Sequence, residues 1–163
     1  MEDIMYKDFV FSNIIACIHN WTWQELLVGV EESIITVEMI VEYAKKIINE
    51  EISNYEMVLG IIIAERSEEV MELVRNLVER EREEDKQEIL DKWCYAMLLE
   101  LFLKRSEYSD VFKEIASIGA DFMHPRDMDS FVYYMPTNGI AMEINWINYL
   151  KDQSLRFGID ISL

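Results

Sequence analysis

The sequence predicts an all-α protein, a single compact domain of about seven to eight helices packed as antiparallel pairs. Only five glycines and two prolines occur in 163 residues, which disfavours a fold rich in turns. Hydrophobic residues make up 51% of the chain, enough to build one core over residues 1–163 without disulfides or metals. In most segments the apolar residues recur at the i, i+3, i+4, i+7 spacing of amphipathic helices.

The first half of the chain predicts four helices in succession, in addition to a helical stretch at residues 10–18. The sequence TWQE at residues 22–25 has the form of a capping box, which starts the first of them. Residues 36–50, 54–66 and 67–81 follow, with Thr36, Asn54 and Ser67 as the N-cap residues. In the second of these segments the stripe expected to face inward consists of Tyr55, Val58, Leu59, Ile62 and Ile63.

The second half predicts a long helix over residues 85–104, and this helix is apolar nearly all round in its later part. A helix of that kind belongs in the centre of a domain. Residues 106–119 form the next amphipathic helix, with Gly119 as its expected C-terminal stop. A final helix is predicted over residues 140–152, after an Asn-Gly turn.

The stretch HPRDMDSFVYYMP at residues 124–136 groups a histidine, an arginine and two aspartates, so it could be a catalytic or metal-binding loop. Its order of residues favours a short helix instead. Pro125 suits the first helical position and His124 the N-cap, while Asp127 falls in the first turn. Pro136 ends the element, and the residues expected to face inward are Met128, Phe131, Val132 and Met135.

Few residues could carry catalytic or cofactor chemistry. A zinc site would have to gather Cys17, His19, Cys94 and His124, whose spacing fits no metal-binding motif. Phosphate-binding, dinucleotide-binding and nucleophile motifs do not occur in the sequence. Glu100 lies within the most apolar helix and could be a buried acid with a perturbed pKa, although we expect it at a polar edge. We therefore predict no cofactor, no metal and no enzymatic activity.

The location predicted for the chain is the cytoplasm. The longest apolar stretch, residues 93–103, is interrupted by Glu100 and is too short to span a membrane. The acidic start of the chain lacks the basic region of a signal peptide. The two cysteines form no motif that points to an oxidising compartment.

Charge is the most unusual property of the sequence. Thirty-two acidic residues against fifteen basic ones give a net charge of −17. Such a surface repels nucleic acids and anionic membranes and attracts basic partners, although plain solubility would explain it equally well. Residues 1–64 hold eleven acidic and three basic residues, a net charge of −8, whereas residues 65–91 hold eleven and five. The partner-binding surface is therefore predicted in the N-terminal half, at Glu31, Glu32, Glu38, Glu42, Trp23 and Tyr43.

Both aromatic residues of this predicted surface have an alternative place in the core. Trp23 stands at the first position of its predicted helix and could border the acidic surface. Tyr43 could do the same from the next helix. The sequence leaves both interpretations open.

Three segments together resemble a family of small helical bacterial proteins. They are ADFMHPRDMDSFVYYMP (120–136), DKWCYAMLLELF (91–102) and TVEMIVEYA (36–44). That family is a domain of unknown function associated with immunity to polymorphic toxins, and the likeness extends from about Trp21 to Leu150. Arg126 departs from the expected pattern, which has a further acidic residue after the proline; this changes the charge at one helix start.

The resemblance implies a protein that binds and blocks a toxin made by the same cell or its kin, without catalytic residues of its own. A nuclease is one class of toxin that would suit the charge, because nucleases are basic where they hold phosphate. Two alternatives remain. One is an acidic adaptor protein without a toxin partner, and the other, least favoured, is an enzyme that uses buried carboxylates.

Overall fold

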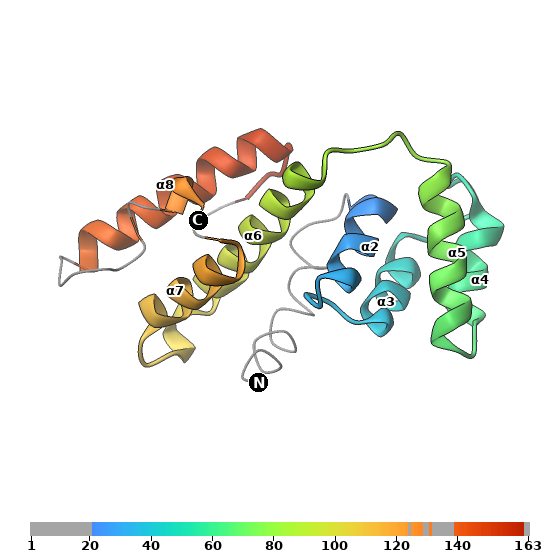
Figure 1. Cartoon of the computed structure of the whole chain (residues 1–163), viewed down its shortest axis with the longest axis horizontal. Coiled ribbons are helices and arrows are strands. Elements are labelled where there is room, and N and C mark those ends of the chain that lie inside the picture. The colour runs from blue at the N-terminus through green and yellow to red at the C-terminus, as the bar shows by residue number, and fades with distance from the viewer. Residues whose placement is uncertain (1–20, 124, 129–130, 132–138, 162–163) are drawn as a thin grey trace. The chain divides into compact units, whose positions relative to one another are not determined.

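The computed structural model describes residues 21–123, 125–128, 131 and 139–161. These residues form seven α-helices and two short 3-10 helices and no strand, which confirms the all-α prediction. The predicted helix over residues 10–18 lies outside them. The elements (Figure 1) are α2 Trp23–Glu31, α3 Val37–Ile47, α4 Tyr55–Ile63, α5 Ser67–Glu79, α6 Lys86–Leu103, η1 Arg105–Glu107, α7 Val111–Asp121, η2 Arg126–Met128 and α8 Gly139–Phe157.

The contacts between residues divide the chain into two compact units, and the boundary falls inside α6, between Ile89 and Leu90. The first unit contains α2 to α5 and the beginning of α6. The second contains the rest of α6 with α7, α8 and the two 3-10 helices. The prediction of one domain over residues 1–163 stays a prediction.

In the first unit, α3, α4 and α5 pack against one another, and α2 packs against α5 (Figure 1). Residues 64–66 join α4 to α5, and these two helices run antiparallel. Asn54, before α4, accepts a hydrogen bond of 2.8 Å from Arg80 at the end of α5. Halfway along, a Cβ on Gly60 would lie 3.1 Å from Leu73, so the missing side chain of Gly60 permits the close approach.

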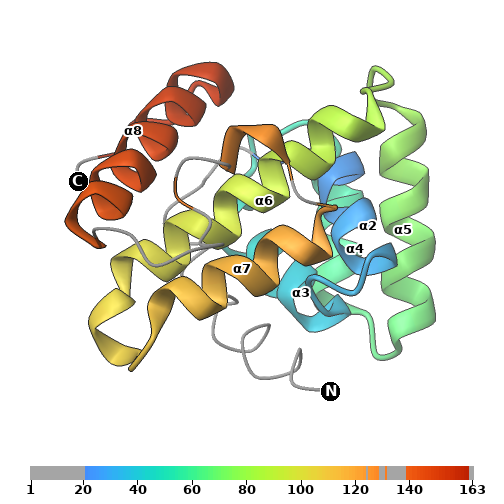
Figure 2. The same cartoon turned by 60° about the vertical axis from the view of Figure 1, so that its left-hand side comes forward.

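In the second unit, α6 and α8 form another antiparallel pair. Tyr95 and Ser154 share a hydrogen bond of 2.7 Å between their hydroxyl groups. Nearer the end of α6, the ring of Phe102 meets Trp146 of α8 edge-on, with 5.0 Å between the ring centroids. The rings of Phe112 from α7 and of Phe131 also lie near Trp146. Figures 1 and 2 both draw α7 alongside α6.

The centre of α6 is buried, as the sequence predicts. Every residue from Lys92 to Phe102 has a buried side chain, and Leu98 is 0% exposed. The expectation that Glu100 lies at a polar edge is wrong, because Glu100 is only 1% exposed. Lys104, one turn later, lies 3.5 Å from its carboxylate. A buried carboxylate is tolerated when such partners compensate for its lost hydration.

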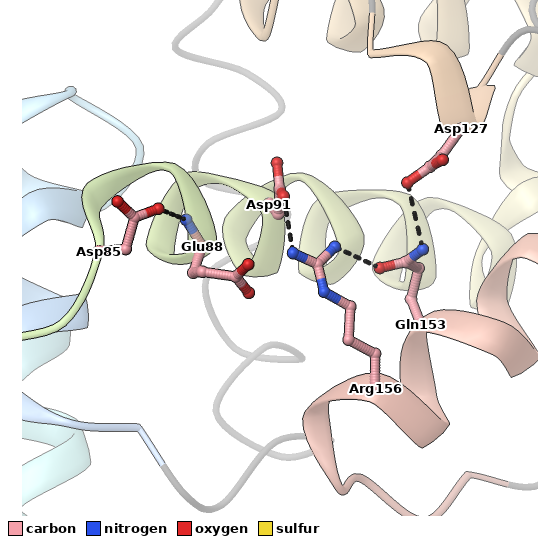
Figure 3. A network of polar contacts seen from close by, with 6 residues as sticks. All are labelled: Asp85, Glu88, Asp91, Asp127, Gln153 and Arg156. Atoms are coloured by element: carbon pink, nitrogen blue, oxygen red, sulfur yellow. Dashed lines mark hydrogen bonds and ion pairs between the residues drawn. The ribbon is translucent and has the colours of Figure 1, made fainter.

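Polar side chains also connect α6, η2 and α8 (Figure 3). Arg156 on α8 donates to the carboxylate of Asp91 on α6 at 2.9 Å and to the side-chain oxygen of Gln153 at 3.1 Å. The amide of Gln153 lies 3.4 Å from the carboxylate of Asp127 in η2. This Asp91–Arg156 network holds the start of α6, the second 3-10 helix and the end of α8 together.

The structure tests only part of the predicted helix over residues 124–136 and corrects it there. Its described part is the 3-10 helix η2, in which Met128 bonds back to Pro125 and Phe131 to Met128. Met128 and Phe131 are fully buried, as expected. His124, Val132, Met135 and Pro136 lie outside the described residues.

Several predicted helix ends differ from those observed. Helices α3 and α4 end earlier than predicted, at Ile47 and Ile63, and α7 begins later, at Val111. The N-cap of α5 is Arg66 and not the predicted Ser67.

Gly119 does not stop α7, which continues to Asp121; Met123 instead takes the left-handed conformation that ends such helices. Gly119 is buried within α7. The last helix, α8, is longer than predicted and reaches Phe157.

The predicted inward stripe of α4 is wrong in part. Val58 and Ile61 are the buried residues of this helix, whereas Leu59 is 36% exposed and Ile63 is 68% exposed. The helix is apolar nearly all round, so its periodicity does not distinguish the face that packs from the face that points outward.

Candidate interaction surface

The predicted acidic residues lie on the surface of the first unit. Glu31 ends α2 and Glu32 follows it, while Glu38 and Glu42 lie one turn apart on the exposed side of α3. Glu32 lies 3.3 Å from Lys86, and Glu42 lies 3.2 Å from Lys45. Glu31 and Glu38 have no ion pair with any residue that the structure describes. We call the exposed carboxylates Glu31, Glu32, Glu38 and Glu42 the α2–α3 acidic surface.

The two aromatic residues predicted for this surface differ in their exposure. Tyr43 is only 4% exposed, and its hydroxyl donates a hydrogen bond of 3.0 Å to the carbonyl of Trp21. Burial, with smaller contributions from the nearby carboxylates of Glu25 and Glu81, raises the pKa of Tyr43 to about 12. The ring of Tyr43 thus belongs to the core. Trp23 is half-buried and meets Tyr43 edge-on, with 6.0 Å between the ring centroids.

The capping box predicted at the start of α2 is confirmed. Thr22 accepts a hydrogen bond of 3.1 Å from the backbone N–H of Glu25, whose carboxylate accepts one of 2.9 Å from Thr22. The buried position of Glu25 follows from this role. Glu25, one of the acidic residues in the N-terminal excess, therefore serves to cap α2.

The connection between α5 and α6 provides further caps for α2, which the sequence did not predict. The carboxylate of Glu81 accepts hydrogen bonds from the backbone of Trp23 at 2.9 Å and of Gln24 at 3.0 Å. Glu84 accepts one from the Thr22 hydroxyl at 3.1 Å, and its backbone N–H donates to the Gln24 side chain at 2.9 Å. Negative charge at a helix N-terminus stabilises both the free N–H groups and the helix dipole.

Among the residues that the structure describes, Cys94 is placed unfavourably for covalent or metal chemistry. Cys94 is buried, and burial is the main reason why the pKa of its thiol is raised to about 12. A hydrogen bond with Tyr149 lowers this pKa, whereas the carboxylates of Asp91 and Asp127 raise it. A thiol that stays protonated at neutral pH is a poor nucleophile and metal ligand. The described residues contain no group of three or more His, Cys, Asp or Glu side chains arranged to hold a metal ion. Cys17, His19 and His124 lie outside them, so the prediction of no metal stays a prediction.

A membrane-spanning role finds no candidate in the described part of the chain. None of its helices combines the length and the apolarity that crossing a bilayer requires. The longest apolar helix, α6, is interrupted by the buried Glu100.

The fold and its surface define an acidic all-α protein whose excess charge lies on exposed helix faces. The chain belongs to the bacterial family described as "Uncharacterized protein conserved in bacteria (DUF2247)", which matches residues 11–154. No curated protein and no solved structure matches the chain. Membership confirms that part of the predicted resemblance which names a bacterial family of unknown function; the association with toxin immunity stays a prediction.

Proposed function

We propose that this chain is an immunity protein, which neutralises a bacterial polymorphic toxin domain in the cytoplasm by stoichiometric binding and not by catalysis. Its partner is a basic protein domain, with a nuclease as the class that best suits the charge. The binding needs no cofactor, nucleic acid or membrane.

The observation that carries this proposal is the uneven charge of the surface. Residues 21–89 hold eighteen acidic and seven basic residues, a net charge of −11, whereas residues 90–163 hold eleven and seven, a net charge of −4. Glu31 and Glu38 are exposed, so their charge acts on an approaching partner. An excess of one sign steers an oppositely charged partner and raises the association rate.

The resemblance to toxin-immunity proteins supports the identity of the partner, and the bacterial family supports the setting. An acidic adaptor would share the charge without binding one toxin tightly. A gene next to this one that encodes a secreted toxin with a basic C-terminal domain would favour immunity over the adaptor. The carboxylate enzyme has Glu100 as its best candidate, and the contact with Lys104 gives that residue a structural role.

Co-expression with the toxin encoded next to this gene tests the proposal. The wild-type chain is expected to rescue growth, and E31K/E38K/E42K is expected to rescue it poorly at equal protein level. A matched control, E107K/D152K/D160K, makes the same change in charge at exposed residues of the second unit and should protect like the wild type. Full protection by a folded E31K/E38K/E42K variant would exclude the α2–α3 acidic surface. Failure of the wild type to protect against any toxin encoded beside it would remove the immunity role.

A further inference from the structure

The outward face of α4 is an apolar surface within the most acidic part of the first unit. Leu59 and Ile63 are exposed one helical turn apart, and the half-buried Tyr55 and Ile62 flank them. These four positions follow the i, i+4, i+7, i+8 spacing of one helix face. We call Tyr55, Leu59, Ile62 and Ile63 the α4 apolar face.

The packing of the first unit explains why this face stays open. Helices α3 and α5 pack against α4, with Gly60 of α4 close to Leu73 of α5 (Figure 1). They bury Val58 and Ile61 of α4. Single exposed apolar residues are common on protein surfaces, whereas an apolar stripe along one helix marks a site of interaction.

Acidic residues precede and follow the α4 apolar face in the chain. Residues 50–72 contain seven acidic residues and one basic residue, Arg66, which lies 3.5 Å from Glu69. Glu56 lies one turn before Leu59, and Glu65 and Glu68 follow shortly after Ile63. All three are exposed, and the connection between α4 and α5 places the last two at the end of α4 that carries Ile63.

We propose that the α4 apolar face is the docking centre for a basic protein surface in which lysine or arginine residues surround an apolar side chain. A second copy of this chain would bring the same acidic rim against this one, and an anionic membrane would likewise be repelled. Apolar residues inside a polar rim provide most of the binding free energy of a typical interface. The α4 apolar face therefore sets the lifetime of the complex, while the α2–α3 acidic surface speeds its formation.

This inference rests on the proposed function for the identity of the partner. Two probes test the docking centre and the immunity role separately. The first is the basic C-terminal domain of the toxin encoded next to this gene. Binding is measured for the wild type, for L59S/I63S and for the control I144S/L155S, which removes two exposed apolar side chains from α8. We expect L59S/I63S to weaken binding by about thirtyfold or more, through faster dissociation at an unchanged association rate. The control should bind like the wild type.

The second probe is a pair of designed amphipathic helical peptides, one made of leucine and lysine and the other of leucine and glutamate. We expect the lysine peptide to shift the backbone amide resonances of α4 in the wild type and not in L59S/I63S, and the glutamate peptide to leave them unchanged. Neither substituted side chain is part of the buried core, so circular dichroism should show a folded variant whose melting temperature is at most modestly lower. Should the double variant fail to fold, I63S alone serves, because Ile63 is the more exposed of the two.

The two probes give distinguishable outcomes. Wild-type affinity of the folded L59S/I63S variant for the toxin domain would overturn the docking centre and leave the immunity role intact. Lysine-peptide shifts confined to α4, without binding to the toxin domain, would support the docking centre and remove the immunity role. Lysine-peptide shifts elsewhere, with α4 unaffected, would overturn the docking centre.

Discussion

Helix α4 and the later part of α6 are apolar nearly all round, and only the latter is buried. In α6 every side chain from Lys92 to Phe102 is buried, since Trp146, Met128 and Ser154 of the second unit pack against it. In α4 only Val58 and Ile61 are buried. Apolar composition therefore predicts that a helix has a buried face. Whether its other face is also buried depends on how many elements pack against the helix.

The largest expected effect is a contrast between a core position and an exposed one. Leu98→Asp buries an unpaired charge in the centre of α6 and should lower the free energy of unfolding by several kcal/mol, enough to unfold many domains of this size. Ile63→Asp on α4 should change it by only about 0.5 kcal/mol. Urea denaturation followed by circular dichroism measures both. A stable L98D protein, or an I63D protein as unstable as L98D, would contradict the burial of α6 and the exposure of Ile63.

The buried Tyr43 in the first unit should make the free energy of unfolding depend on pH. Burial raises the pKa of Tyr43 from 10.0 to about 12 in the folded protein, so folding favours the protonated form. This stabilisation is complete below pH 10, and it decreases as the pH rises from 10 to 12, because only the unfolded chain ionises there. The loss should be of the order of 2 kcal/mol.

The control for this effect is Tyr43→Phe, which cannot ionise. Unfolding free energies of both proteins are measured from pH 9 to pH 12, where other groups also titrate, and the difference between the two proteins isolates Tyr43. The wild type should lose stability relative to Y43F across that window. A constant difference would mean that the hydroxyl is not buried in the folded state.

The polar contacts of α2 should have an effect of intermediate size. Glu81→Gln removes the negative charge from the two backbone N–H groups at the start of α2, and we expect a loss of about 1 kcal/mol in unfolding free energy. Glu83→Gln, two residues away and exposed, removes the same charge and serves as the control. Equal stability of E81Q and E83Q in thermal melts would contradict a capping role for Glu81.

The smallest effect is expected for the ion pair between Arg156 and Asp91 in the second unit. Both side chains are partly exposed, so a double-mutant cycle with Arg156→Ala and Asp91→Ala should give a coupling of about 0.2–1 kcal/mol. Added salt should reduce it. A coupling above about 2 kcal/mol would show that this contact holds α8 against α6 more strongly than a surface ion pair can.

The sequence predicted those features of the helices that depend on residues close together in the chain. The capping box of Thr22 and Glu25 and the buried centre of α6 follow from residues close together in sequence. The outward face of α4 could not be predicted, because Leu59 and Ile63 have the same spacing as a core stripe. The burial of Glu100 could not be predicted either, because it depends on the packing of the whole second unit.

The predicted interaction surface was likewise predictable only where it depends on residues close together in the chain. The exposure of Glu31, Glu38 and Glu42 follows from helical periodicity, since they lie opposite or outside the apolar stripe. The caps that Glu81 and Glu84 provide for α2 join residues about sixty positions apart, so a count of charges along the chain does not reveal them. Tyr43 is in the core because Trp21 supplies an acceptor for its hydroxyl, a contact that sequence spacing does not indicate.

The most direct test of the immunity role is a titration of the purified chain against the basic C-terminal domain of the toxin encoded next to its gene. Size-exclusion chromatography with light scattering reports the complex, and an assay of the toxin's own activity reports its inhibition. An immunity protein should form a complex of fixed stoichiometry and abolish toxin activity once the toxin is saturated. A toxin domain that elutes alone and stays active at every ratio would contradict the immunity role.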